Sequence, residues 1–165
     1  LSALCGRSDT ILQDRLNHAS LLDGAQLSRA RLKRYLHSDM RSLARQLDGA
    51  PGRVLIASDG VFSMDGDVAP LAQLADLAQQ HAAALMIDDA HGLGTLGETG
   101  KGILQHFSLS NESVPIYMAT LGKALGGGSG GFTTGRREVI DLLRQRSRPY
   151  LFSNTLPPPL VMLMV

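Results

Sequence analysis

Polar side chains end three short apolar runs of the sequence. Asp59, Asp88 and Thr120 each stand at the carboxyl end of such a run. Short apolar runs followed by Gly or Asp are typical of buried parallel strands, and the ligands of an open parallel sheet bind beyond the carboxyl ends of its strands. We therefore expect the three following loops to converge on one crevice, where their side chains act together.

Lys123 is the first candidate for chemistry in these loops. It lies between Thr120 and a glycine-rich segment, and its neighbours Gly122, Ala124 and Leu125 include no acid to pair with it. We expect partial desolvation, which lowers the pKa of an ammonium group and makes the amine a nucleophile suited to Schiff-base formation. The alternative interpretation is a solvated surface lysine.

Asp88 and His91 form a second candidate pair. Because a carboxylate at the end of a buried strand is costly unless it meets a cation, we expect Asp88 to face a protonated heterocyclic nitrogen while His91 contacts a neighbouring polar group. Two alternatives stay open. Asp88 or Asp89 can simply cap the turn, or Asp88, Asp89 and His91 can bind a metal ion for hydrolysis. The metal alternative lacks a second nearby histidine and gives Lys123 no role.

His18 and Ser63 have ordinary structural interpretations when each is taken alone. His18 follows the strand-like run 10–16, and Ser63 lies in a loop of glycines and acids. Together with Lys123 and Asp88, however, they are the groups that pyridoxal phosphate requires. The lysine forms a Schiff base with the cofactor, and the aspartate keeps the pyridine nitrogen protonated so that the ring accepts electrons. We therefore expect a pyridoxal-phosphate site.

Strand-like and helical patterns alternate along the chain. We predict strands at 53–58, 84–88 and 115–120 and helices at 39–47, 70–81 and 136–146. Ser38 or Asp39 is the expected cap of the first helix, and Pro70 suits the first position of the second. The alternation predicts an α/β fold with a mostly parallel sheet and flanking helices. The glycine-rich segment 126–131 matches no phosphate-binding fingerprint, so we interpret it as a flexible loop or a close approach of two backbone segments.

Composition places the chain in a broad class. With 165 residues, 44% of them hydrophobic and 19% charged, it is typical of one globular domain. A net charge of +1 argues against a nucleic-acid binder, and the single cysteine, Cys5, excludes an internal disulfide framework. No run approaches the roughly 18 apolar residues of a membrane span, and no secretory signal is visible. We expect a cytoplasmic protein, or a mitochondrial one in a eukaryote, with no membrane or nucleic-acid partner.

Three motifs carry a resemblance to a known family. They are Asp-Gly-Val-Phe-Ser-Met-Asp-Gly at 59–66, Asp-Asp-Ala-His-Gly at 88–92 and Thr-Leu-Gly-Lys-Ala-Leu-Gly at 120–126. In combination they resemble the α-oxoamine synthases, which are fold-type I pyridoxal-phosphate enzymes. The resemblance extends from about residue 12 to residue 158. It implies that the chain is part of a large domain like that of aspartate aminotransferase.

The resemblance also implies roles for individual residues. By position, Lys123 would bond covalently to the cofactor and act as the base, and Asp88 would pair with its pyridine nitrogen. His91 and Ser63 would contact the phenolic oxygen of the cofactor, and His18 would stack on its ring. The remaining members would bind phosphate: Thr120 in the same subunit, and Ser153, Asn154 and Thr155 in the neighbouring subunit of a homodimer with a shared active site.

The resemblance implies an acyltransferase that joins an amino acid to a thioester of CoA or acyl carrier protein. Segments 14–22 and 114–120 resemble the branch of the family that joins alanine to a pimeloyl thioester, with loss of CO2, in biotin synthesis. Segments 126–132 and 143–154 resemble the branch that joins glycine to acetyl-CoA. The first likeness covers more of the chain. A truncated or purely dimerising module without catalysis is the alternative from another class.

The two ends of the sequence also support an expectation. The chain opens at Leu1 rather than Met and closes on the apolar run 160–165. We interpret residues 1–165 as the central part of the cofactor-binding large domain. An upstream segment and a small C-terminal domain are expected outside it.

Overall fold

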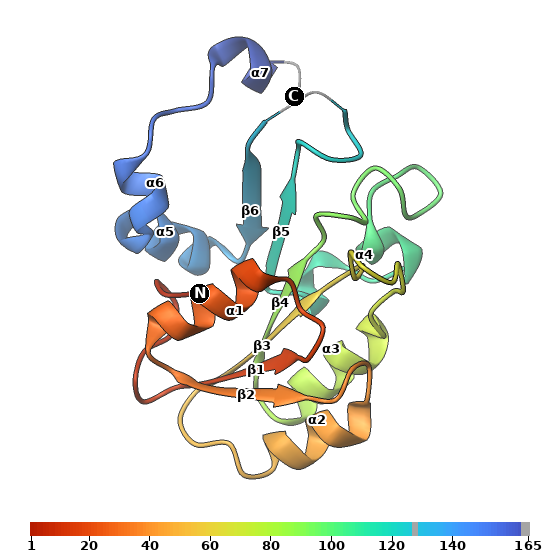
Figure 1. Cartoon of the computed structure of the whole chain (residues 1–165), viewed down its shortest axis with the longest axis vertical. Helices are drawn as coiled ribbons and strands as arrows, with labels where there is room; N and C mark the ends of the chain where they lie inside the picture. The colour runs from red at the N-terminus through yellow and green to blue at the C-terminus, as the bar shows by residue number, and fades with distance from the viewer. Residues whose placement is uncertain (127–128, 163–165) are drawn as a thin grey trace.

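The computed structural model describes residues 1–126 and 129–162, and its centre is one six-stranded sheet (Figure 1). The strand order is β2-β1-β3-β4-β5-β6, in which β5 and β6 are antiparallel and every other neighbouring pair is parallel. The strands are β1 (Thr10–Asp14), β2 (Arg31–Tyr35), β3 (Val54–Asp59), β4 (Ala84–Asp88), β5 (Ile116–Thr120) and β6 (Gly131–Gly135). The predicted α/β fold with a mostly parallel sheet is confirmed.

Helices cover both faces of the sheet. The helical segments are α1 (Ala19–Ser28), α2 (Met40–Leu47), α3 (Leu71–Gln80), α4 (Ile103–His106), a 3-10 turn (Asn111–Ser113), α5 (Arg137–Arg146), α6 (Arg148–Phe152) and α7 (Pro158–Met162). One face packs against α2, α3 and α4, and the other packs against α1 and part of α5. Among the described residues no helix is long and apolar enough to cross a membrane.

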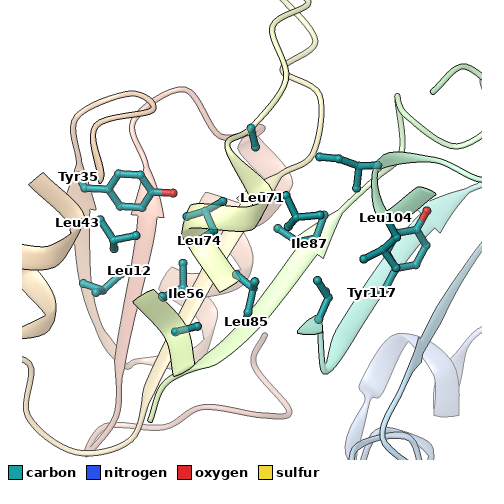
Figure 2. Packing of buried hydrophobic residues seen from close by; sticks show 14 of the residues in the cluster. Leu12, Tyr35, Leu43, Ile56, Leu71, Leu74, Leu85, Ile87, Leu104 and Tyr117 are labelled. Carbon is teal, nitrogen blue, oxygen red and sulfur yellow. The ribbon is translucent and has the colours of Figure 1, made fainter. Parts of the chain in front are cut away.

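The apolar strands are explained by burial on both faces. Leu71 and Leu74 of α3 lie among Ile56, Leu85 and Ile87 of the central strands (Figure 2). The alternate residues of those strands pack on the opposite face with α1. A strand buried on both sides has no polar face, which is why the central runs read as continuously apolar.

The predicted elements agree closely with the structure. The strand at 84–88 is confirmed to the residue, and the strand at 53–58 is shifted by one residue. Asp39 caps α2, and its Oδ1 accepts the Ser42 N–H at 2.9 Å. One expectation is wrong in detail, because Pro70 precedes α3 as its N-cap residue and does not occupy its first helical position. The helix predicted at 136–146 forms as α5, but none of its residues is fully buried.

Two strands were not predicted. β2 has the sequence Arg-Leu-Lys-Arg-Tyr and forms an edge of the sheet, where charged side chains reach solvent. β6 begins inside the glycine-rich segment at Gly131, where an added Cβ would lie 2.9 Å from the backbone oxygen of Ala119. At Gly131 the interpretation as a close backbone approach is confirmed. Residues 127–128 of that segment lie outside the described residues.

Candidate active site

The register of three neighbouring strands brings their carboxyl ends together. Asp59 of β3 pairs with Asp88 of β4, and Asp88 pairs with Met118 of β5, two residues before Thr120. Backbone bonds extend the pairing beyond the strands, since the Gly60 N–H donates to the Asp88 oxygen at 2.7 Å. The three loops therefore begin side by side, as expected, whereas the crevice between them stays a prediction.

Asp88 is a buried carboxyl group at this edge. It is 6% exposed, and its Oδ1 accepts the Ala90 N–H at 3.1 Å. Burial raises the pKa of Asp88, while the Ala90 hydrogen bond and the nearby charge of Lys123 act in the opposite direction. Within the described chain its Oδ2 accepts no hydrogen bond. Asp88 therefore caps the turn with one oxygen and leaves the other free of hydrogen bonds within the described chain.

Lys123 and His91 come into direct contact. The Lys123 Nζ lies 2.8 Å from the His91 Nε2, although 32 residues separate them in sequence. Burial and the neighbouring lysine charge lower the pKa of His91, so its ring is neutral near pH 7 and accepts a hydrogen bond from the ammonium group. The expected desolvation of Lys123 is wrong for this structure. Its side chain is exposed because the loop that carries it stands at the surface.

A hydrogen bond between His18 and Asp59 links the turn between β1 and α1 to the end of β3. The backbone N–H of His18 donates to the Asp59 Oδ2 at 2.6 Å. The His18 Nδ1 caps α1 by accepting the Ser20 N–H at 3.2 Å, and this bond fixes the orientation of the ring. Burial raises the pKa of Asp59 to about 6. The sequence shows Asp59 only as a carboxylate directly after an apolar run. Nothing else in the sequence predicts its hydrogen bond to the His18 N–H.

Asn17 is a site-building residue that sequence reasoning missed. Its Nδ2 donates to the Ala57 oxygen at 2.7 Å, and its Oδ1 accepts the Asp59 N–H at 3.1 Å. Both bonds span about forty residues and tie the β1–α1 turn to the end of β3. No local pattern around an asparagine in a turn reveals such partners.

Thr120 and Ser63 have no hydrogen bond to Lys123, His91 or Asp88 among the described residues. The Thr120 Oγ1 donates to the backbone oxygen of Gly130 at 3.0 Å, which joins the two ends of the connection between β5 and β6. Ser63 is exposed in the loop between β3 and α3, which a Val61–Val68 bridge closes. Among the described residues no hydrogen bond joins Ser63 to Lys123, His91 or Asp88.

Three further candidates lie apart from this cluster. Ser153, Asn154 and Thr155 are exposed in the connection between α6 and α7. The Ser153 Oγ donates to the Pro149 oxygen, within the same segment. Among the described residues of one chain, no hydrogen bond joins these three residues to Lys123, His91 or Asp88.

Asp89 turns into the interior. It is fully buried, and its Oδ2 accepts the Tyr117 hydroxyl at 2.6 Å and the Ile103 N–H at 2.8 Å. Burial raises the pKa of Asp89 in spite of these bonds. Asp89 therefore links β4, β5 and α4 and does not share a ligand position with His91. Across residues 1–126 and 129–162, no three His, Cys, Asp or Glu side chains gather as metal ligands.

Comparisons with known proteins place the chain in a family. The model of the aminotransferase class I and II family matches residues 1–164. An 8-amino-7-oxononanoate synthase of Pseudomonas putida is 56% identical over 160 residues, which is 97% of this chain and 41% of the relative. A protein of the same name from Pseudomonas aeruginosa is 53% identical over 158 residues, which is 96% of this chain and 39% of the relative. The chain thus spans about two fifths of the length of these curated relatives.

Solved structures agree with the sequence comparison. A serine palmitoyltransferase from S. paucimobilis, described with a bound PLP–myriocin aldimine, matches with a TM-score of 0.90 and 31% identity over 97% of this chain and 42% of that one. An 8-amino-7-oxononanoate synthase from Francisella tularensis matches with a TM-score of 0.81 and 34% identity over 98% of this chain and 46% of that one. The resemblance carried by the three motifs is confirmed, and the chain belongs to the aminotransferase class I and II family, within its α-oxoamine synthases.

Proposed function

We propose that the protein is a pyridoxal-phosphate-dependent acyltransferase, and specifically an 8-amino-7-oxononanoate synthase that joins alanine to a pimeloyl thioester with loss of CO2. The observation that carries the proposal is the contact of Lys123 with neutral His91 beside the buried Asp88. The relatives at 53–56% identity, which cover 96–97% of this chain, bear that name. In this proposal residues 1–165 belong to the cofactor-binding large domain.

The residues at the strand ends fit the proposed cofactor. Asp59 and Asp88 are both buried, and burial raises both of their pKa values, so a cation between the loops relieves an existing electrostatic cost. A pyridinium N–H is such a cation, and the Oδ2 of Asp88 would be its acceptor. When bound, pyridoxal phosphate supplies an electron-accepting ring that stabilises negative charge on the α-carbon of the substrate.

Each proposed role follows from what a side chain can donate or accept. Lys123 would provide the amine that bonds to the carbonyl carbon of the cofactor with loss of water, and neutral His91 would take up the proton that the ammonium group gives up. Once the amino group of the substrate has replaced it, the freed Lys123 amine would take the α-proton of the amino acid. His18, held by its bond to Ser20, presents a ring face for stacking.

The other proposed contacts are hydrogen bonds from hydroxyl, imidazole and amide groups. Ser63 and His91 contact the phenolic oxygen of the cofactor, and Thr120 contacts its phosphate. We further propose a cytoplasmic homodimer in which an exposed segment completes the phosphate site of the neighbouring subunit. The members of that segment are Ser153, Asn154 and Thr155.

Chemical labelling tests the cofactor assignment. In the full-length protein incubated with pyridoxal phosphate, borohydride reduction and peptide mapping should place a pyridoxyl group on Lys123. The other lysines of this chain, Lys33 and Lys101, are internal controls. A label on either control, or an unlabelled Lys123, contradicts the proposal.

Product analysis tests the substrate assignment. The full-length protein is expected to release CO2 and 8-amino-7-oxononanoate from alanine and pimeloyl-CoA or pimeloyl carrier protein. Faster turnover of glycine with acetyl-CoA would assign it to the branch that segments 126–132 and 143–154 resemble. A labelled Lys123 without turnover of either pair would indicate a cofactor-binding module without catalysis.

A further inference from the structure

A second polar cluster lies at the carboxyl ends of β1 and β2, beside the candidate active site. Its members are Asp14, the last residue of β1, His37, which follows β2, and Asp67, from the loop between β3 and α3. That loop also carries Ser63. None of the three cluster residues takes part in the proposed chemistry.

His37 is bound through both of its ring nitrogens. Its Nδ1 lies 2.9 Å from the Asp14 Oδ1, and its Nε2 lies 2.6 Å from the Asp67 Oδ2. Ionised carboxylates only accept hydrogen bonds, so both bonds form at once when each nitrogen carries a proton. Burial disfavours the charged ring, but the hydrogen bonds and charges of Asp14 and Asp67 together outweigh burial and raise the pKa of His37.

One side of this bridge is firmly anchored. The Asp14 side chain is 2% exposed, and it also accepts the N–H groups of Leu16 and Ser38, each at 2.8 Å. The Asp67 side chain is 40% exposed, so water can replace its bond to His37 more easily. Loss of a proton from His37 therefore releases the Asp67 side first.

The other side of the bridge holds the loop around Ser63. The Phe62 N–H donates to the backbone oxygen of Asp67 at 3.0 Å, which closes the turn that contains Ser63. The buried Phe62 ring also meets the edge of His37, with ring centroids 4.5 Å apart and planes perpendicular. His37 thus contacts both residues that bracket the turn.

We propose that His37 is a positioning residue, which bridges Asp14 and Asp67 as an imidazolium and thereby fixes the 60–69 loop, and with it Ser63, at the edge of the site. The charged groups that face it are Asp14 from β1 and Asp67 from the loop, and Phe62 contributes an uncharged ring. Only the contact of Ser63 with the cofactor rests on the proposed function. The anchoring of the loop stands on its own.

Hydrogen exchange of the full-length, cofactor-free protein tests the anchoring. In His37→Gln, exchange of the amides at 62–67 should accelerate at least about tenfold, because a hydrogen bond to a charged group is lost. Exchange of the strand at 54–59 should stay unchanged. His81→Gln is the matched control, since His81 makes a longer 3.8 Å pair with the exposed Asp48. Equal exchange at 62–67 in both variants overturns the proposal.

A titration covers the case in which His37→Gln does not fold. In Asp67→Asn the shape of the loop residue is kept and its charge is lost, so the pKa of His37 should fall toward the ordinary value. Histidine NMR of the cofactor-free protein measures this, with His81 as the internal reference. An unchanged His37 titration shows that the bridge to Asp67 is absent and overturns the proposal.

The protein with bound pyridoxal phosphate tests whether the loop affects the cofactor. In Asp67→Asn the absorbance spectrum of the bound cofactor should change its pH dependence, whereas in His81→Gln it should match the parent protein. An unchanged pH dependence in Asp67→Asn overturns the link to Ser63. Failure of Lys123 to accept the cofactor would refute the proposed function and leave the exchange and NMR results to decide the role of His37.

Discussion

Asp59 and Asp88 occupy paired positions of β3 and β4, and both carboxyl groups are buried. Burial raises the pKa of each, and the charge of Asp88 raises the pKa of Asp59 further, while the positive charge of Lys123 acts in the opposite direction on both. Two such acids side by side are costly to ionise together. At the scale of residues, the cofactor-free site therefore carries an electrostatic cost that a bound cation relieves.

This cost should appear in the pH dependence of stability. The pKa of Asp59 rises from 3.8 to about 6 on folding, so the folded state binds more protons between these values. Stability should fall as pH rises from about 4 to about 6, and the full cost, up to about 3 kcal/mol, should persist above pH 6.

A neutral variant of Asp59 tests this cost. Asp59→Asn keeps an oxygen for the His18 N–H and removes the charge. In urea unfolding of the cofactor-free protein it should stabilise the fold at pH 7 by about 1–3 kcal/mol and have little effect at pH 4. An equal effect at both pH values would contradict this explanation.

Asp88 should matter for chemistry more than for binding. Asp88→Asn keeps an oxygen for the Ala90 N–H but loses the negative charge that, in the proposed function, would stabilise a protonated ring nitrogen. Exchange of the α-proton of alanine with solvent deuterium should slow on the order of 100-fold, while the cofactor dissociation constant changes much less. NMR of the exchange and a cofactor titration measure the two effects. Near-normal exchange would leave Asp88 as a turn cap alone.

At the scale of elements, Asp89 joins three pieces of the fold. Its Oδ2 binds the hydroxyl of Tyr117 on β5 and the N–H of Ile103 at the start of α4. Space for the carboxylate comes from glycines, because a Cβ at Gly92 would lie 2.0 Å from Oδ1 and one at Gly102 would lie 2.1 Å from Oδ2. The buried Asp89 carboxylate therefore fixes the start of the loop that carries His91.

Removal of the tyrosine hydroxyl tests this link. In Tyr117→Phe the buried Asp89 loses its 2.6 Å donor, so the free energy of unfolding should drop by about 1.5–3 kcal/mol. Tyr150→Phe is the matched control, since Tyr150 is 65% exposed, and it should stay within about 0.5 kcal/mol of the parent. Chemical denaturation at pH 7 measures both. Equal stabilities would mean that Asp89 does not depend on Tyr117.

At the scale of the whole molecule, the described chain gathers some of the candidate residues and leaves others at a distance. The ends of β3, β4 and β5 bring together Asp88, His91 and Lys123. The segment after α6 stays exposed, and so does the large apolar side chain of Phe152 beside it. This arrangement suits the proposed homodimer, in which the segment serves the neighbouring subunit.

Subunit mixing tests the shared site. Lys123→Ala and a variant with alanine at 153–155 should each be inactive as a full-length protein. After co-refolding, random pairing should restore about a quarter of the parental activity, because half of the dimers are mixed and each mixed dimer has one intact site. Mixing without refolding is the control. No recovery from two inactive variants would place residues 153–155 in the site of their own subunit, and an active 153–155 variant would place them outside it.

Local sequence was enough to identify the strands whose ends carry Asp59, Asp88 and Thr120. The runs before Asp59, Asp88 and Thr120 are apolar because both faces of these strands are buried, and that burial leaves a direct mark on composition. The N-cap of α2 was predicted for a similar reason, since Asp39 bonds a backbone group only three residues away. The edge strand β2 was not predicted, because solvent on one side permits charged residues and the run is not apolar.

Only the tertiary structure decided which distant residues meet. The strand order came only from the structure. So did the contact between His91 and Lys123 and the bridge from Asp14 through His37 to Asp67, which join residues more than twenty positions apart. The exposure of Lys123 was likewise beyond local reasoning, because it depends on what packs over the loop and not on its flanking residues. A sequence thus determines where a polar group stands on its own element, whereas its partner, its burial and its pKa come from elements that the chain brings back across long separations.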